Sequence, residues 1–142
     1  MIVYLDASAL VKRYIAEEGS RDVERLLGVS RFAGTVLISR AEVASAIGKA
    51  VRLGAIERAK GANALSAFHR DWESLVRIQL TEMVAERASG YAWEMKLRGY
   101  DAVHLAAAVF WQEMMGEPVL LATYDRQLWD AAARAGLESW PK

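Results

Sequence analysis

The chain has 142 residues, carries 18 basic and 18 acidic side chains, and is 54% hydrophobic. This length and apolar content fit one compact domain, residues 1–142, and exclude intrinsic disorder. The absence of cysteine excludes disulfide scaffolds, thiolate zinc sites and a cysteine nucleophile. Because the net charge is zero, a polyanion would have to be held by a local basic patch or through bound metal.

Nothing in the sequence points to a membrane. No apolar run approaches the ~18–20 residues that span a bilayer. The first ten residues, MIVYLDASAL, lack the basic start and long apolar core of a signal peptide. We therefore expect a cytoplasmic protein that does not associate with membranes.

Short apolar runs alternate with amphipathic stretches along the chain. In chain order they predict strand Ile2–Leu5, helix Ser8–Ile15, helix Arg21–Leu27, strand Thr35–Ile38, a helix from Ser39 to Gly54, helix Glu57–Leu75, strand Val76–Leu80, helix Thr81–Leu97, helix Asp101–Met115, strand Val119–Ala122, helix Arg126–Ala135 and a short strand, Leu137–Trp140. Ser39 and Glu42 form an S-x-x-E capping-box pattern. Strands separated by helices indicate an α/β fold whose parallel sheet is covered on both faces.

Acidic residues follow or begin several of these predicted elements. Asp6 follows the first strand, Glu42 comes shortly after the second, and Asp125 follows the fourth. Asp101 opens the most apolar helix. Open parallel sheets bind ligands beyond the carboxyl ends of their strands. The fold is therefore expected to bring these acids to one edge of the sheet.

Each acid alone is better explained as a helix cap, and Glu42 alone as half of a capping box. Taken together, four ionised carboxylates about 6 Å apart would repel one another by roughly 3 kcal/mol per pair at an effective dielectric near 20. Such a cluster must bind cations or take up protons. Oxygen ligands without cysteine or a histidine pair suit Mg²⁺ or Mn²⁺ rather than Zn²⁺. Hard divalent ions in acidic sites act on phosphates, which predicts phosphodiester hydrolysis.

Four segments carry a resemblance to a known family: LDASALVKRYIAEEGS, SRAEVASAI, LRGYDAVHLAAA and LATYDRQLWDAAARAGL. Together they span most of the chain from Met1 to Leu137. The sequence resembles PIN-domain ribonucleases and, within them, the VapC-type toxins of toxin–antitoxin pairs. The residues that match the family's acidic and small hydroxyl positions are Asp6, Glu42, Asp101, Asp125, Ser8 and Thr123.

The resemblance implies a three-layer α/β/α sandwich with a parallel sheet of four to five strands, the first and fourth adjacent at its centre. It implies an endoribonuclease that depends on Mg²⁺, with Mn²⁺ able to substitute. It also implies a homodimer that is silenced by a cognate VapB-like antitoxin. Asp6 and Asp101 would be the principal metal ligands, Asp125 and Glu42 would complete the cage, and the hydroxyls would orient these carboxylates.

Other residues leave alternatives open. His104 is better explained as a structural histidine on a packed helix than as a ligand. The basic residues near the acids either contact phosphates or are ordinary surface charge; they are Lys12, Arg13, Arg98 and Arg126. A haloacid-dehalogenase phosphatase is disfavoured because position 8 is serine where that class needs a second aspartate. The main rival is a non-catalytic domain that binds RNA or protein and whose acids only cap helices.

Overall fold

The computed structural model describes residues 1–142 and contains one five-stranded parallel sheet in the order β3-β2-β1-β4-β5. The strands are β1 (Ile2–Leu5), β2 (Phe32–Val36), β3 (Val76–Ile78), β4 (Val119–Ala122) and β5 (Glu138–Trp140). The central strand β1 pairs with β2 on one side and with β4 on the other, where Tyr4 lies opposite Leu121. The first and fourth strands are therefore adjacent, as predicted.

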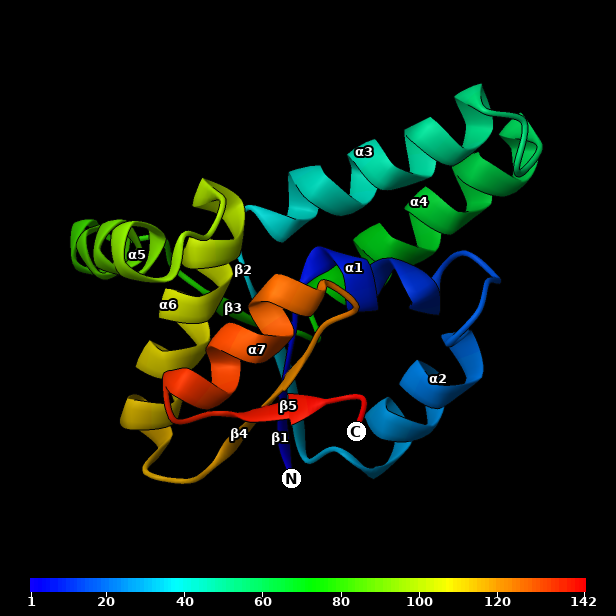
Figure 1. The fold of residues 1–142 in the computed structure, drawn as a ribbon. Helices are drawn as coiled ribbons and strands as arrows, with labels where there is room; N and C mark the ends of the chain where they lie inside the picture. Colours follow the sequence, from blue (N-terminus) through cyan, green and yellow to red (C-terminus); the bar gives the residue numbers. More distant parts are fainter.

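Helices cover both faces of this sheet (Figure 1). They are α1 (Ala7–Leu10), the 3₁₀ turn η1 (Val11–Arg13), α2 (Ser20–Val29), α3 (Ser39–Arg52), α4 (Arg58–Trp72), α5 (Glu82–Met95), α6 (Gly99–Met115) and α7 (Arg126–Arg134). The three-layer α/β/α fold predicted from the sequence is confirmed. No helix is both long enough and apolar enough to cross a membrane.

The alternation of side chains along β1 explains the two cores. Ile2 and Tyr4 point to the core formed with α5, α6 and α7. Val3 and Leu5 point to the opposite core, formed with α1 to α4. All four residues are buried, because a central parallel strand is covered on both faces. The β1 carboxyl end is thereby fixed between the layers, and Asp6 follows it directly.

The second strand begins earlier than the sequence predicted. It runs over Phe32–Val36 instead of Thr35–Ile38. The sequence pattern missed Gly34, where a Cβ atom would lie 2.8 Å from the Trp111 ring. The glycine is required by this close approach of α6, which a local strand pattern does not show. Ile38 then serves as the backbone N-cap of α3, without a side-chain cap.

The helix that carries Asp101 also begins earlier than predicted. Gly99, expected to stop the preceding helix, is the first residue of α6, and Arg98 is its N-cap. The chain reverses at Lys96, which closes α5 in the left-handed conformation with φ of 55°. This boundary places Asp101 in the first turn of α6, at the same edge of the sheet as Asp6.

Candidate active site

Asp6 is a buried carboxylate that three hydrogen-bond donors hold in place. It is 4% exposed and caps α1, with Oδ1 accepting from the Ala9 amide at 3.0 Å and from the Ser8 hydroxyl at 2.7 Å. The Thr123 hydroxyl donates to Oδ2 at 2.6 Å. These donors fix the orientation of the carboxylate.

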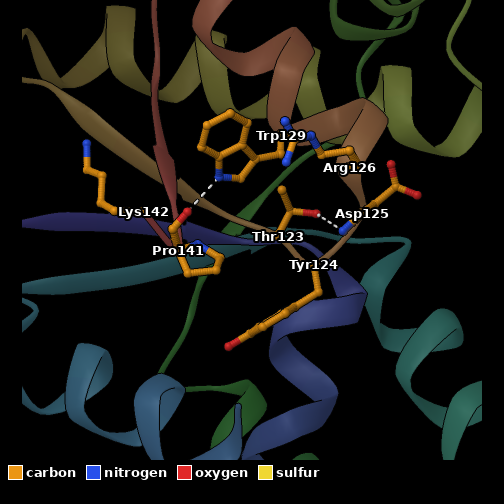
Figure 2. A pocket seen from close by; sticks show the side chains of 7 residues that line it. All are labelled: Thr123, Tyr124, Asp125, Arg126, Trp129, Pro141 and Lys142. Carbon is orange, nitrogen blue, oxygen red and sulfur yellow. Dashed lines mark hydrogen bonds between the residues drawn. The ribbon is translucent and has the colours of Figure 1, made fainter. Parts of the chain in front are cut away.

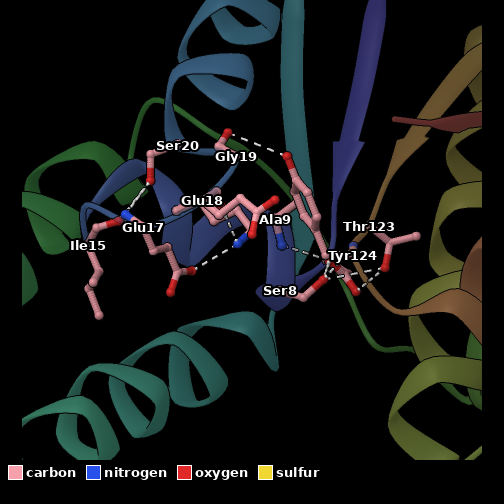
Figure 3. A network of polar contacts seen from close by, with 11 residues as sticks. Ser8, Ala9, Ile15, Glu17, Glu18, Gly19, Ser20, Thr123 and Tyr124 are labelled. Atoms are coloured by element: carbon pink, nitrogen blue, oxygen red, sulfur yellow. Dashed lines mark hydrogen bonds and ion pairs between the residues drawn. The ribbon is translucent and has the colours of Figure 1, made fainter. Parts of the chain in front are cut away.

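Thr123 joins the ends of the two central strands. It follows β4, is 1% exposed, and its Oγ1 accepts from the Asp125 amide at 3.0 Å while donating to Asp6. The Ser8 hydroxyl accepts from the Tyr124 amide at 2.9 Å, so a second hydrogen bond joins the segment after β4 to the segment after β1 (Figure 3). The two hydroxyl residues predicted beside the acids therefore lie beside Asp6 and order the loop that carries Asp125.

Asp101 and Asp125 share one cation, the guanidinium of Arg98. Arg98 Nε donates to Asp101 Oδ2 at 3.0 Å, and Nη2 donates to Asp125 Oδ2 at 2.7 Å. The other Asp125 oxygen accepts from the Leu128 amide at 2.9 Å and caps α7. The Arg98 side chain is 71% exposed, so it is held from the solvent side by these two ionic hydrogen bonds.

The electrostatics show that three of the acids affect one another. Burial raises the pKa of Asp101, and the charges of Asp125 and Asp6 raise it further. The hydrogen bond and positive charge of Arg98 act in the opposite direction. Arg98 bonds to both Asp101 and Asp125, and the Thr123 hydroxyl bonds both to Asp6 and to the Asp125 amide. The structure therefore brings Asp6, Asp101 and Asp125 to one edge of the sheet.

The Glu42 carboxylate is hydrogen-bonded to the buried side chain of His104. Glu42 Oε1 lies 2.7 Å from His104 Nε2, and His104 Nδ1 lies 2.8 Å from the Tyr4 hydroxyl. A carboxylate only accepts, so Nε2 of His104 carries the hydrogen of this bond, and Nδ1 forms the bond to Tyr4. His104 is 2% exposed, in agreement with its predicted structural role.

The predicted capping box is wrong. The Glu42 side chain bonds to His104 and not to the backbone at the start of α3. Ser39 is fully buried inside the helix, and its hydroxyl lies 2.6 Å from that of Thr35. Local spacing could not reveal the partner of Glu42, because His104 is 62 positions away in the sequence.

The basic residues near the acids have different partners. Lys12 Nζ donates to Glu17 at 3.1 Å and to the Glu18 carbonyl at 2.7 Å, and it lies 4.3 Å from the centre of the Tyr124 ring. Figure 3 shows the bonds of this loop, including that of the Tyr124 hydroxyl to the Gly19 carbonyl. Lys12 is thus occupied within the chain, and Arg98 is occupied by the acids.

A surface hollow of about 340 Å³ opens directly beside Asp125 (Figure 2). Its walls come from the end of β4, the start of α7 and the residues after β5. The lining residues are Thr123, Tyr124, Asp125, Arg126, Trp129, Pro141 and Lys142. The hollow therefore joins the acidic edge of the sheet to a wall that carries aromatic rings and positive charge.

The donor set fits a hard divalent cation. All of the candidate ligands are carboxylate oxygens, and two of them already share one positive charge on Arg98. No group of three or more acidic or histidine side chains is arranged to hold a metal ion as it stands. The repulsion expected from the sequence is partly offset within the chain. Asp101 and Asp125 share Arg98, Glu42 bonds to His104, and Asp6 accepts from two hydroxyls and an amide.

Comparison with known proteins gives the family. No protein-family model matches the sequence. Ribonuclease VapC45 from Mycobacterium tuberculosis (strain CDC 1551 / Oshkosh) is 33% identical over 141 residues, which is 99% of this chain and 95% of that protein. VapBC2 from Rickettsia felis, solved with a DNA fragment from its promoter, has a TM-score of 0.67 at 15% identity, covering 99% of this chain and 100% of that one. A toxin–antitoxin complex from Klebsiella pneumoniae has a TM-score of 0.58 at 16% identity, covering 83% of each chain.

The two solved structures show that the fold is shared. The layers and the acidic sheet edge define a PIN-type α/β/α domain. The identity to VapC45 over nearly the whole length of both chains is sufficient to show the family. This chain belongs to the VapC ribonucleases, which confirms the resemblance found in the sequence.

Proposed function

We propose that this protein is a divalent-metal-dependent endoribonuclease and the toxin of a VapBC-type toxin–antitoxin pair. The observation that supports it best is that Asp6, Asp101 and Asp125, which come from three distant parts of the chain, are linked at one sheet edge through Arg98 and Thr123. Because the chain belongs to the VapC ribonucleases, RNA is the proposed class of substrate. Acids that act on one another at a sheet edge are the arrangement that phosphodiester hydrolysis with a metal requires.

We assign the metal ligands among the four acids. Asp6 and Asp101 are the principal ligands, and Asp125 and Glu42 complete the cage or hold water. The ion is Mg²⁺, with Mn²⁺ able to substitute, because the donors are oxygen atoms only. When bound, such an ion supplies positive charge to the phosphate and lowers the pKa of water.

The remaining residues hold these ligands in position. Thr123 and Ser8 donate to the two oxygens of Asp6, which fixes the direction of its free lone pairs. His104, buried against Tyr4, holds the Glu42 carboxylate toward α6. Arg98 offsets part of the charge of Asp101 and Asp125 before a metal ion binds, and its exposed side chain lies on the solvent side of both carboxylates.

The rival function, a binding domain whose acids only cap helices, explains half of the site. Asp6 and Asp125 do cap α1 and α7 through backbone amides. Asp101 bonds only to Arg98 and Glu42 only to His104, so neither caps a helix. Capping therefore does not account for two acids of the four.

We also propose the partners. The similarity to VapBC2 and to a toxin–antitoxin complex supports a cognate VapB-like antitoxin. The homodimer stays a prediction, which light scattering of the purified chain measures. Because the proposed substrate is cellular RNA, we place the activity in the cytoplasm.

The test is cleavage of total RNA in the presence of Mg²⁺, followed by mapping of the new ends. Asp101→Asn should abolish cleavage, whereas Glu86→Gln, which changes an exposed acid on α5, should leave it intact. EDTA should stop the wild-type reaction. Cleavage by Asp101→Asn at the wild-type rate would disprove the assignment of this site.

A further inference from the structure

The hollow beside Asp125 combines features that a nucleotide requires. Two aromatic side chains, Tyr124 and Trp129, lie on either side of Thr123 and Pro141 (Figure 2). Two cations, Arg126 and Lys142, line the same hollow. Its volume of about 340 Å³ is in the range of small-ligand pockets. A chain with zero net charge thus places positive charge and aromatic surface next to its acidic site.

The aromatic walls are held rigidly before any ligand binds. The Trp129 indole donates to the Pro141 carbonyl at 2.7 Å. The Tyr124 ring packs edge-on against Trp140 and lies under the Lys12 ammonium. Rings that are already fixed lose little conformational entropy when a base stacks on them. Both residues still line the hollow.

Arg126 is poorly placed to stabilise its own helix. It is the first residue of α7, where a positive charge opposes the helix dipole. Its partner Asp130 is four residues further on, which is the less favourable order for an ion pair on a helix. The Arg126 side chain is 82% exposed and stacks over Trp129 at 5.1 Å. The guanidinium is therefore available to a phosphate at the mouth of the hollow.

We propose that this hollow is a subsite for one nucleotide of single-stranded RNA adjoining the scissile phosphate. Its base stacks on the Tyr124 and Trp129 side of the hollow, and its phosphate contacts Arg126. The proposal rests on the ribonuclease function proposed above, because Asp125 belongs to both. A duplex is excluded from this subsite because its bases are already stacked and paired.

The test is binding without cleavage. The full chain in EDTA is titrated with a labelled single-stranded RNA octamer over a range of salt concentrations. Arg126→Gln should weaken binding about 3- to 10-fold and reduce the slope of log K against log salt by about 0.7, the value for one phosphate of a single strand. The control is Arg134→Gln, which removes the same charge from the exposed far end of α7 and should change neither quantity.

A second arm tests the base. Octamers with one abasic position are compared, and one position should weaken binding of the wild type about 5-fold or more. Tyr124→Leu should lose that difference, and Tyr124→Phe, which keeps the ring, should retain it. Melting temperatures of all variants verify that they are folded.

The outcomes separate the two proposals. Equal binding by wild type and Arg126→Gln, no effect of any abasic position, or equally tight binding of a duplex overturns the subsite, whether or not RNA is cleaved. Absence of cleavage by the wild type in Mg²⁺, with the binding differences intact, overturns the nuclease function and retains the nucleotide site. A wild type that does not bind the octamer overturns the subsite.

Discussion

Arg98 is the N-cap residue of α6 and Asp125 is that of α7, and a hydrogen bond of 2.7 Å joins their side chains. The same guanidinium bonds to Asp101 at 3.0 Å. Arg98 thus acts as an internal counter-ion for two proposed metal ligands. A divalent ion and the guanidinium must compete for the same carboxylates, which leads to the first prediction.

Arg98→Ala should lower the melting temperature in EDTA, because Asp101 and Asp125 lose their shared cation. Saturating Mn²⁺ should raise the melting temperature of Arg98→Ala by more than it raises that of the wild type, by mass action on the folded state. Differential scanning fluorimetry measures both. Arg31→Ala, which breaks an ion pair with Glu117 elsewhere on the surface, should respond to Mn²⁺ like the wild type. An equal response by Arg98→Ala would contradict the competition.

Asp6→Asn should lower RNA cleavage by at least about 10²-fold, since the buried ligand loses its charge. Asparagine still accepts from the Ala9 amide as an N-cap, so the fold should remain. The free energy of unfolding should fall by only about 1–2 kcal/mol, the cost of placing the new amide beside the Thr123 hydroxyl. Urea unfolding and a cleavage assay measure the two effects. Full activity in a folded Asp6→Asn protein would reject Asp6 as a ligand.

Thr123→Val should reduce cleavage by roughly 10- to 100-fold, the usual effect of losing a group that orients a metal ligand. The valine cannot donate to Asp6 or accept from the Asp125 amide. Unfolding free energy should fall by about 1–3 kcal/mol for the unsatisfied buried groups. Thr123→Ser retains the hydroxyl and should keep most of the activity. Equal rates for the valine and serine variants would show that the hydroxyl has no orienting role.

His104→Leu should destabilise the protein by about 2–4 kcal/mol, because it leaves the buried Tyr4 hydroxyl without its partner and Glu42 without its donor. Adding Tyr4→Phe removes the orphaned hydroxyl. The double variant should therefore be more stable than the sum of the single variants predicts. Denaturant unfolding of all three proteins completes the cycle, and strict additivity would argue against the Tyr4–His104 bond.

Gly61→Ala tests the contact of α3 with α4. A Cβ atom at this position would overlap the Val51 side chain. The substitution should cost about 1–3 kcal/mol through overpacking. Val51→Ala in the same chain should recover part of that loss by making room. Gly90→Ala has open space around it and should be neutral or stabilising. A neutral Gly61→Ala would show that the helices can move apart.

The position of the acids was predictable because parallel strands end at the same edge of a sheet. Asp6 directly follows β1, and Asp125 lies shortly after β4. The apolar runs identified both strands correctly. The partners of the acids were not predictable in the same way. Arg98 was recognised only as a basic residue near an acid, and its second bond, to Asp125, spans 27 positions.

The hollow could not be predicted from the sequence pattern either. Trp129 and Pro141 come from α7 and from the residues after β5, and the contact between them is tertiary. The β2 boundary was missed for the same reason, since Gly34 is required by Trp111. In each case a local pattern located the element, and packing between distant elements decided its boundary or its partner.

The hydrogen bond between Thr123 and Asp6 joins residues 117 positions apart. During synthesis, β1 leaves the ribosome first, but its neighbour β4 and the loop with Asp125 emerge only near the end of translation. Until then Asp6 has neither Thr123 to orient it nor the Asp125 carboxylate beside it. The proposed metal site of the nascent chain is thus incomplete until its last strands have docked.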